Sequence, residues 1–64
     1  MIIYRLINEV QGVLRLFDNA FIPFDPANTD YANFKAQILA DEAQLEDAEG
    51  VIMADAKAYV ASLP

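Results

Sequence analysis

The chain has 64 residues, a hydrophobic fraction of 56 % and a net charge of −6, with ten acidic against four basic side chains. A chain of this length forms one small domain near the lower size limit for folding alone, so disulfides, a structural metal or a partner usually supports it. The absence of cysteine and histidine removes disulfides, most zinc sites and any catalysis that needs a thiolate or an imidazole. A protein partner is the support that remains.

The distribution of charge argues against nucleic-acid binding. Residues 1–22 sum to zero, so residues 23–64 carry the whole acidic imbalance. A chain of this kind has no basic stripe that could neutralise phosphates. No apolar run approaches the roughly 18 residues that a membrane span needs, so we expect neither a nucleic-acid nor a membrane partner.

The first third of the chain has the composition of a β-hairpin over about residues 2–22. Residues 2–9 are rich in β-branched and aromatic side chains, and residues 12–17 repeat that character. A five-residue loop over 8–12 would place Arg5 opposite Arg15, which is unfavourable. A two-residue turn at Gln11 and Gly12 instead pairs Val10 with Val13, Leu6 with Phe17 and Arg5 with Asp18. We favour this second register.

Both faces of the predicted hairpin are apolar. One face carries Ile2, Tyr4, Leu6, Val10, Val13 and Phe17, and the other carries Ile3, Ile7, Leu14 and Leu16, with Ile22 as a further candidate. Either the ribbon curls and the C-terminal segments wrap it completely, or the second face or the strand edge is buried against another subunit. We favour the partner, because exposed apolar patches and free edges usually mark interaction sites.

The predicted partner interface therefore lies on the second face of the hairpin. It comprises Ile3, Arg5, Ile7, Leu14, Arg15 and Leu16. The two arginines would either anchor carboxylates of the partner or pair across the strands with Asp18 and its neighbours.

The segment after the hairpin predicts a turn over 23–29 that leads into a helix. Its corner residues are Pro23, Asp25, Pro26, Asn28, Asp30 and Tyr31. Pro23 ends strand pairing or marks an edge, and Asp25 with Pro26 sets the turn. Asn28 or Thr29 caps the helix.

Two short helices are predicted, which makes the chain an α+β domain: an N-terminal β-hairpin followed by two α-helices. The first helix runs over about 30–40, with Tyr31, Phe34, Ile38 and Leu39 at helical spacing, and the second over about 54–62, with Ala56, Tyr59, Val60 and Leu63 on one face. Between them lies an acidic turn over 41–53, which contains a tight turn at 47–50 and short extended segments at 44–46 and 51–53.

Neither acidic group predicts a metal site. Asp41, Glu42, Glu46, Asp47 and Glu49 do not have EF-hand spacing, and neither do Asp25, Asn28 and Asp30. We expect a solvated acidic surface, turned either to water or to a basic partner. Because so short a chain has few residues that could line a pocket, we expect no catalytic residue, no cofactor and no small-molecule substrate.

Two segments resemble proteins of tailed bacteriophages. IPFDPANTDYANFK resembles a motif of small structural and tail-associated phage proteins, with matching positions Ile22, Pro23, Asp25, Pro26, Asn28, Asp30, Tyr31 and Phe34. LEDAEGVIMADAKAYVASLP is similar to the ending of small proteins of marine phages, including cyanophages. Ala54 departs from the threonine or serine cap that is more usual there.

The resemblance implies a virion protein that is made in the host cytoplasm. A tail or tail-fibre position is the first expectation, and a capsid decoration or cement protein is the second. Its partners would be other virion proteins, in many copies of a symmetric assembly. The competing expectation is a small acidic phage protein that binds and inhibits a host protein.

Overall fold

The computed structural model describes residues 1–7 and 10–64 of the chain as one α+β domain, which is the predicted fold class. Residues 8 and 9, at the end of the predicted first strand, lie outside the described residues. The elements are β1 (Ile2–Leu6), β2 (Gly12–Arg15), β3 (Ala20–Pro23), α1 (Thr29–Leu39), β4 (Ala43–Glu46) and α2 (Ala56–Ala61).

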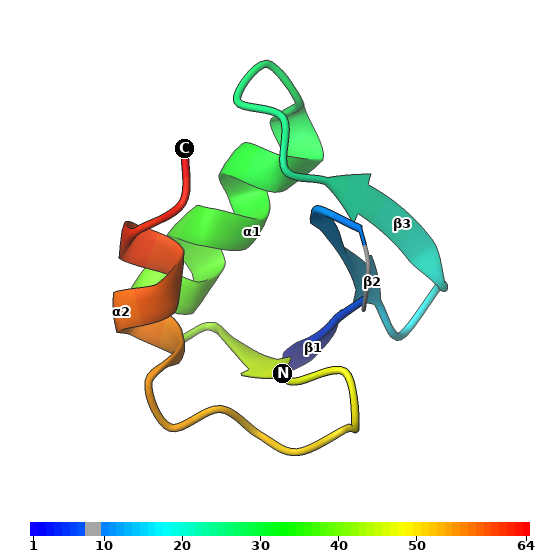
Figure 1. Ribbon diagram of the computed structural model, residues 1–64, viewed down its shortest axis with the longest axis vertical. Helices are drawn as coiled ribbons and strands as arrows, with labels where there is room; N and C mark the ends of the chain where they lie inside the picture. Colours follow the sequence, from blue (N-terminus) through cyan, green and yellow to red (C-terminus); the bar gives the residue numbers. More distant parts are fainter. Residues whose placement is uncertain (8–9) are drawn as a thin grey trace.

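The predicted hairpin is part of a larger mixed sheet with the strand order β3-β2-β1-β4 (Figure 1). β2 pairs antiparallel with both β1 and β3, whereas β4 pairs parallel with β1. β3 arises because the chain turns back at Asn19, whose φ of 56° lies in the left-handed region that asparagine tolerates better than most residues. Residues 20–23 therefore form a third strand, with Pro23 at its end on the sheet edge.

The predicted hairpin register is wrong. Arg5 lies opposite Leu14, not Asp18, and Leu6 lies opposite Val13, not Phe17. The rejected alternative, with Arg5 opposite Arg15, is not observed either. The actual register differs from that alternative by one residue, which sends the two arginines to opposite faces of the sheet and removes their repulsion without a tight turn.

The predicted division of the faces nevertheless survives in most positions. The favoured register and the observed one differ by an even number of residues, and an even shift leaves each side chain on its face. Tyr4 and Val13 are buried under the helices, as expected for the first face. Val10 and Phe17 are exposed instead of joining that face, and Ile22 is buried with it rather than lying with Leu14.

Local signals define the ends of α1. Asn28 is the N-cap, and its side chain accepts a hydrogen bond from the Tyr31 N–H at 3.0 Å. At the other end, the Glu42 N–H donates to the Gln37 carbonyl and the Asp41 N–H to the Ile38 carbonyl. These two bonds form a Schellman motif, in which Asp41 adopts the left-handed conformation with a φ of 60°.

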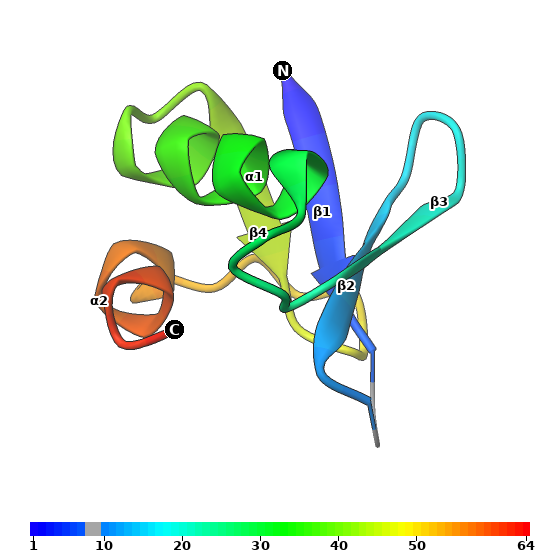
Figure 2. The same cartoon turned by 90° about the horizontal axis from the view of Figure 1, so that it is seen from above.

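The core lies between the sheet and the helices, which both cover the same face of the sheet (Figure 2). Its largest fully buried side chains are Tyr4, Tyr31, Phe34, Ile22, Leu45, Val13 and Val60. The rings of Tyr4 and Phe34 meet edge to face, with centroids 4.9 Å apart, a favourable aromatic geometry. Leu39 of α1, which the spacing placed among the apolar residues of the helix, is about half exposed.

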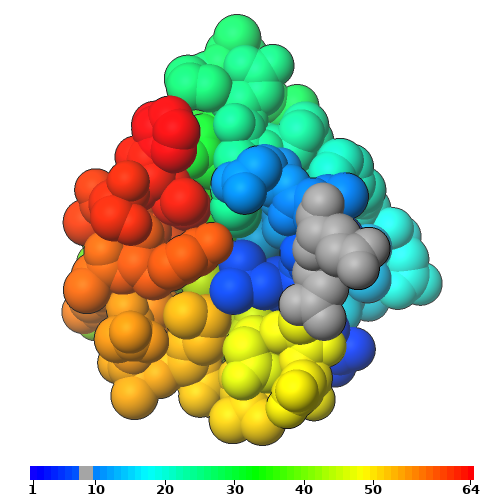
Figure 3. All heavy atoms as spheres, in the orientation of Figure 1, coloured from blue at the N-terminus to red at the C-terminus, as the bar shows by residue number. Residues whose placement is uncertain are grey.

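The C-terminal segment packs against α1. The Tyr31 hydroxyl donates to the Pro64 carbonyl oxygen at 2.9 Å, and Lys35 Nζ donates to the same oxygen at 2.8 Å. The space-filling view shows the red C-terminal residues against the green residues around the start of α1 (Figure 3). α2 is shorter than predicted, and its N-cap Asp55 makes no side-chain capping hydrogen bond.

Candidate functional site

The sheet face away from the helices carries apolar side chains. We call this surface the open face and define it by Ile3, Leu14, Leu16 and Phe21. The strand pairings place all four on one side of the sheet, opposite to the buried Tyr4, Val13 and Ile22. Phe21 is 52 % exposed and the other three are partly exposed. Three of the six predicted interface residues, Ile3, Leu14 and Leu16, therefore lie together.

Arg5 is the fourth predicted interface residue on this side of the sheet, and it is held by Glu46. The two residues are partners in the β1–β4 ladder, and Arg5 Nε and Nη2 contact Glu46 Oε1 at 2.9 and 2.8 Å. Glu46 retains only 12 % side-chain exposure, against 42 % for Arg5. Arg5 therefore borders the open face on the side of β4. Its guanidinium is held in an ion pair and is not a free anchor for a partner's carboxylates.

Arg15 does not belong to the open face, which corrects the predicted interface. It lies opposite Tyr4 on the helix-covered side, because the observed register separates it from Arg5. Its guanidinium binds both carboxylate oxygens of Asp18, at 3.0 and 2.8 Å, and lies 5.1 Å from the centre of the Phe17 ring. The hydrogen bond from Arg15 lowers the pKa of Asp18 below its usual 3.8. Arg15 therefore pairs with Asp18 in the turn between β2 and β3, and its guanidinium is not a free anchor for a partner.

Ile7 also falls outside the open face. β1 ends at Leu6, and Ile7 lines a separate hollow with Val10, Phe24 and Tyr59. Phe24 and Tyr59 pack against the core from the helix side. Ile7 therefore lies at an end of the sheet, away from the pairing that brings Ile3, Leu14 and Leu16 together.

The two edges of the sheet offer little for strand addition. The Phe24 N–H bonds to the Gln11 carbonyl, and antiparallel alternation then turns only the N–H and C=O of Phe21 outward along β3. Pro23 has no N–H, and its carbonyl accepts from Asp25. At the opposite edge, the Met53 N–H donates to the Leu45 carbonyl, so residues 51–53 fold back along β4. The faces, not the edges, are the available surfaces.

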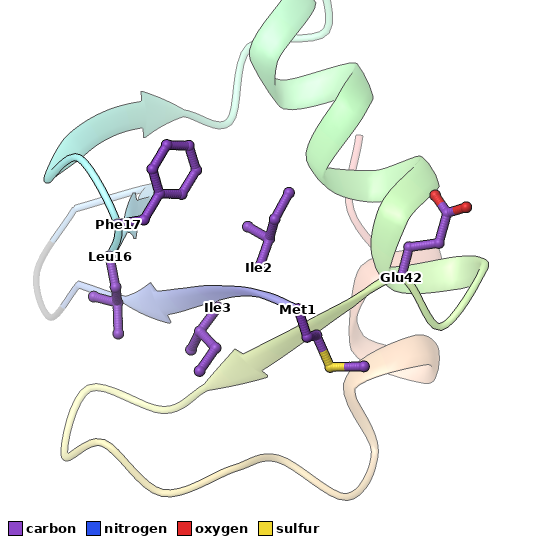
Figure 4. A pocket seen from close by; sticks show the side chains of 6 residues that line it. All are labelled: Met1, Ile2, Ile3, Leu16, Phe17 and Glu42. Carbon is purple, nitrogen blue, oxygen red and sulfur yellow. The ribbon is translucent and has the colours of Figure 1, made fainter.

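A hollow lies at the end of the sheet where β1 begins, and we call it the end hollow. It has a volume of about 510 Å³ and is lined by Met1, Ile2, Ile3, Leu16, Phe17 and Glu42. Figure 4 shows Ile3 and Leu16 pointing the same way from β1 and the end of β2, whereas Ile2 and Phe17 point the opposite way and Glu42 lies beside the end of α1. Because Ile3 and Leu16 belong to both surfaces, the end hollow continues the open face.

Sequence reasoning missed five residues of these surfaces: Phe21 of the open face, and Met1, Ile2, Phe17 and Glu42 of the end hollow. Phe17 was assigned to the covered face, yet it is 70 % exposed. The Asp18-Asn19 pair that follows it is a turn signal that could have ended the strand before Phe17. Nothing local predicts that Glu42 approaches β1, because their proximity depends on the parallel pairing of β4.

The corner residues act on the backbone. Asp25 Oδ1 accepts from the Ala27 N–H at 3.0 Å, and the Asn28 N–H donates to the Asp25 carbonyl. Tyr31 enters the core. The corner thus directs α1 back across the sheet and exposes no cluster of functional groups.

Two kinds of site are not found in the part of the chain that the structure describes. No helix there is long and apolar enough to cross a bilayer. Among the same residues, no three acidic, cysteine or histidine side chains gather to hold a metal ion. Comparisons of the chain with protein-family models, curated proteins and solved structures give no match.

Proposed function

We propose that this chain is a non-enzymatic structural subunit of a phage virion that binds neighbouring subunits through its open face. The observation that carries the proposal is the one-sided placement of the helices. Both cover the face with Tyr4 and Val13, which leaves Leu14, Leu16 and Phe21 turned away from the core. An apolar sheet face that no helix covers and that stays partly exposed is typical of a protein-binding surface.

The hydrogen bonding at the edges of the sheet favours docking on the open face over strand addition at an edge. β3 turns one N–H outward and ends in a proline, and β4 is shielded by residues 51–53. Strand addition needs a row of free N–H and C=O groups. A neighbour therefore packs on the open face with side chains, and the specificity of binding comes from their shape.

The virion setting is supported by the sequence resemblance of residues 22–35 and of the chain's last third. A tail or tail-fibre position is the first proposal and a capsid decoration the second, in each case with many copies in a symmetric assembly. A small acidic phage protein that inhibits a host protein is a further candidate. It is favoured by the surplus of carboxylates on the surface, which suits a basic target.

Mass spectrometry of purified particles of the encoding phage tests the setting. A structural subunit is present in stoichiometric amounts. An inhibitor of a host protein is found in the infected cell and is missing from the particle, a result that would overturn the virion proposal.

Substitution of the open face tests the binding surface. Leu14→Glu with Leu16→Glu should abolish incorporation into particles, because it buries two charges in the interface. Leu39→Glu is the matched control, since Leu39 is an exposed apolar residue of α1. Circular dichroism should show all variants folded. Normal incorporation of the folded double variant would falsify the role of the open face.

A further inference from the structure

Glu42 stands at the rim of the end hollow because of the way α1 ends. It is the second residue beyond the helix cap in the Schellman motif, and its N–H is bound to Gln37. An apolar residue frequently occupies this position and packs back on the helix. Here the side chain is an exposed carboxylate that makes no ion pair or hydrogen bond with any described residue. The helix terminus thus places a free negative charge beside apolar side chains.

No cation of the described residues, the α-ammonium of Met1 included, lies within ion-pair distance of this carboxylate. Arg5 binds Glu46, Arg15 binds Asp18, Lys57 binds Asp41, and Lys35 binds the carbonyl of Pro64. Within residues 1–7 and 10–64, the carboxylates without an ion pair are those of Asp25, Glu42, Asp47, Glu49 and Asp55. These unpaired carboxylates outnumber the two cations that no described carboxylate neutralises, which are the ammonium groups of Met1 and Lys35.

A second copy of the chain does not complement the end hollow. Each copy carries a net charge of −6, so two copies repel each other overall. Like charges brought together at an interface are repulsive unless they are compensated. The occupant is therefore a different chain, which carries its own positive charge.

We propose that the end hollow receives one large apolar side chain of a partner segment, and that a lysine or arginine next to it in that segment pairs with Glu42. The inference rests on the proposed function as a protein-binding subunit and names the chemistry of the segment that is bound. Phe17 and Met1, which are 70 % and 78 % exposed, become buried against the apolar anchor. Glu42 selects basic segments over acidic ones.

Selection of short random peptides on a phage-display library, with the immobilised full chain as bait, tests this inference. Enriched peptides should combine a large apolar residue with a neighbouring lysine or arginine. Binding of the synthesised peptides, measured by fluorescence anisotropy, should weaken in high salt. Enrichment of acidic or purely apolar peptides, or no enrichment at all, overturns the inference.

Substitutions locate the bound peptide. Glu42→Gln should weaken binding about two- to fivefold, the effect of losing one exposed ion pair, and Leu16→Glu should abolish it. Glu49→Gln is the matched control, because Glu49 is an exposed carboxylate that does not line the hollow, and it should leave affinity unchanged. Equal affinity for the wild-type chain and Glu42→Gln overturns the pairing.

The two proposals fail in different ways. If particle incorporation depends on Leu14 and Leu16 while Glu42→Gln is incorporated normally and binds the peptides unchanged, the open face is correct and the end hollow is not the specificity site. If sedimentation at neutral pH shows a dimer that Glu42→Gln strengthens, the occupant is a second copy and the inference is wrong.

Discussion

Tyr4 combines burial with a polar contact in one side chain. It is 1 % exposed, and its hydroxyl donates to Oε1 of Gln37 in α1. Burial raises its pKa above 10.0, although the nearby Arg15 cation opposes part of that change. The fold therefore favours the neutral phenol, and α1 is joined to β1 by a contact that an ionised tyrosine could not make.

The stability of the domain should accordingly fall in alkali. Because the folded state raises the pKa of Tyr4, the stabilisation is complete below the unfolded-state pKa near 10.0 and is lost as the pH rises through the folded-state value. Urea unfolding at increasing pH should show this loss, and Tyr4→Phe should reduce it. At neutral pH the Phe variant should be about 1 kcal/mol less stable, since Gln37 loses its donor. An equal alkaline loss in both proteins would contradict this assignment.

Asp41 is the residue in the least favourable backbone conformation at the end of α1. Its φ is 60°, where glycine has no steric penalty. Asp41→Gly should stabilise the domain by up to about 1 kcal/mol, partly offset by loss of the exposed contact with Lys57. The gain should be larger in a Lys57→Ala background, and unfolding free energies of the four proteins measure it. If Asp41→Gly instead lowers the stability in that background, the left-handed conformation of Asp41 does not cost the domain stability.

Among the elements, β2 and β3 approach each other closely at Gly12. A Cβ added there would lie 2.5 Å from Cε1 of Phe21 and 2.8 Å from the carbonyl oxygen of Ile22. The ring of Phe21 thus lies over the glycine of the neighbouring strand, which explains how so exposed a phenylalanine is held in place.

Gly12→Ala should therefore destabilise the domain by about 1–3 kcal/mol, the usual cost of overpacking. Combined with Phe21→Ala, which removes the ring, it should cost less than the sum of the two single changes. Denaturant unfolding of the single and double variants measures the coupling. Strict additivity would mean that only the backbone contact with Ile22 matters.

The elements that sequence reasoning located well are those set by neighbouring residues. The Asn28 side chain caps α1 by accepting from the N–H of Tyr31, three residues ahead, and the Gly50 N–H closes a turn by donating to the Asp47 carbonyl. The hairpin register and the pairing of β4 depend on residues far apart in the chain. Strands of only four residues, such as Ala43–Glu46, have too short an alternation to specify a partner.

At the scale of the whole molecule, net charge and exposed apolar surface have opposite effects on self-association. The net charge of −6 opposes self-association at neutral pH, whereas the open face, Phe17 and Met1 expose apolar atoms. We expect self-association to increase as the pH falls toward the isoelectric point near 4.1. Light scattering across that range should show it, with less association for the Leu14→Glu, Leu16→Glu variant. Stronger association at neutral pH would contradict this balance.

The parallel pairing of β1 with β4 has a consequence for the order in which the molecule can form. β1 is synthesised before β4, so Ile2 can pair only when Ala43 is available. A nascent chain that ends before β4 leaves Tyr4 and Val13 without Leu45, and the loop that must close spans most of the polypeptide. Closure of so long a loop slows folding more than local helix formation does. The sheet should therefore be completed only after residues 43–46 have been synthesised.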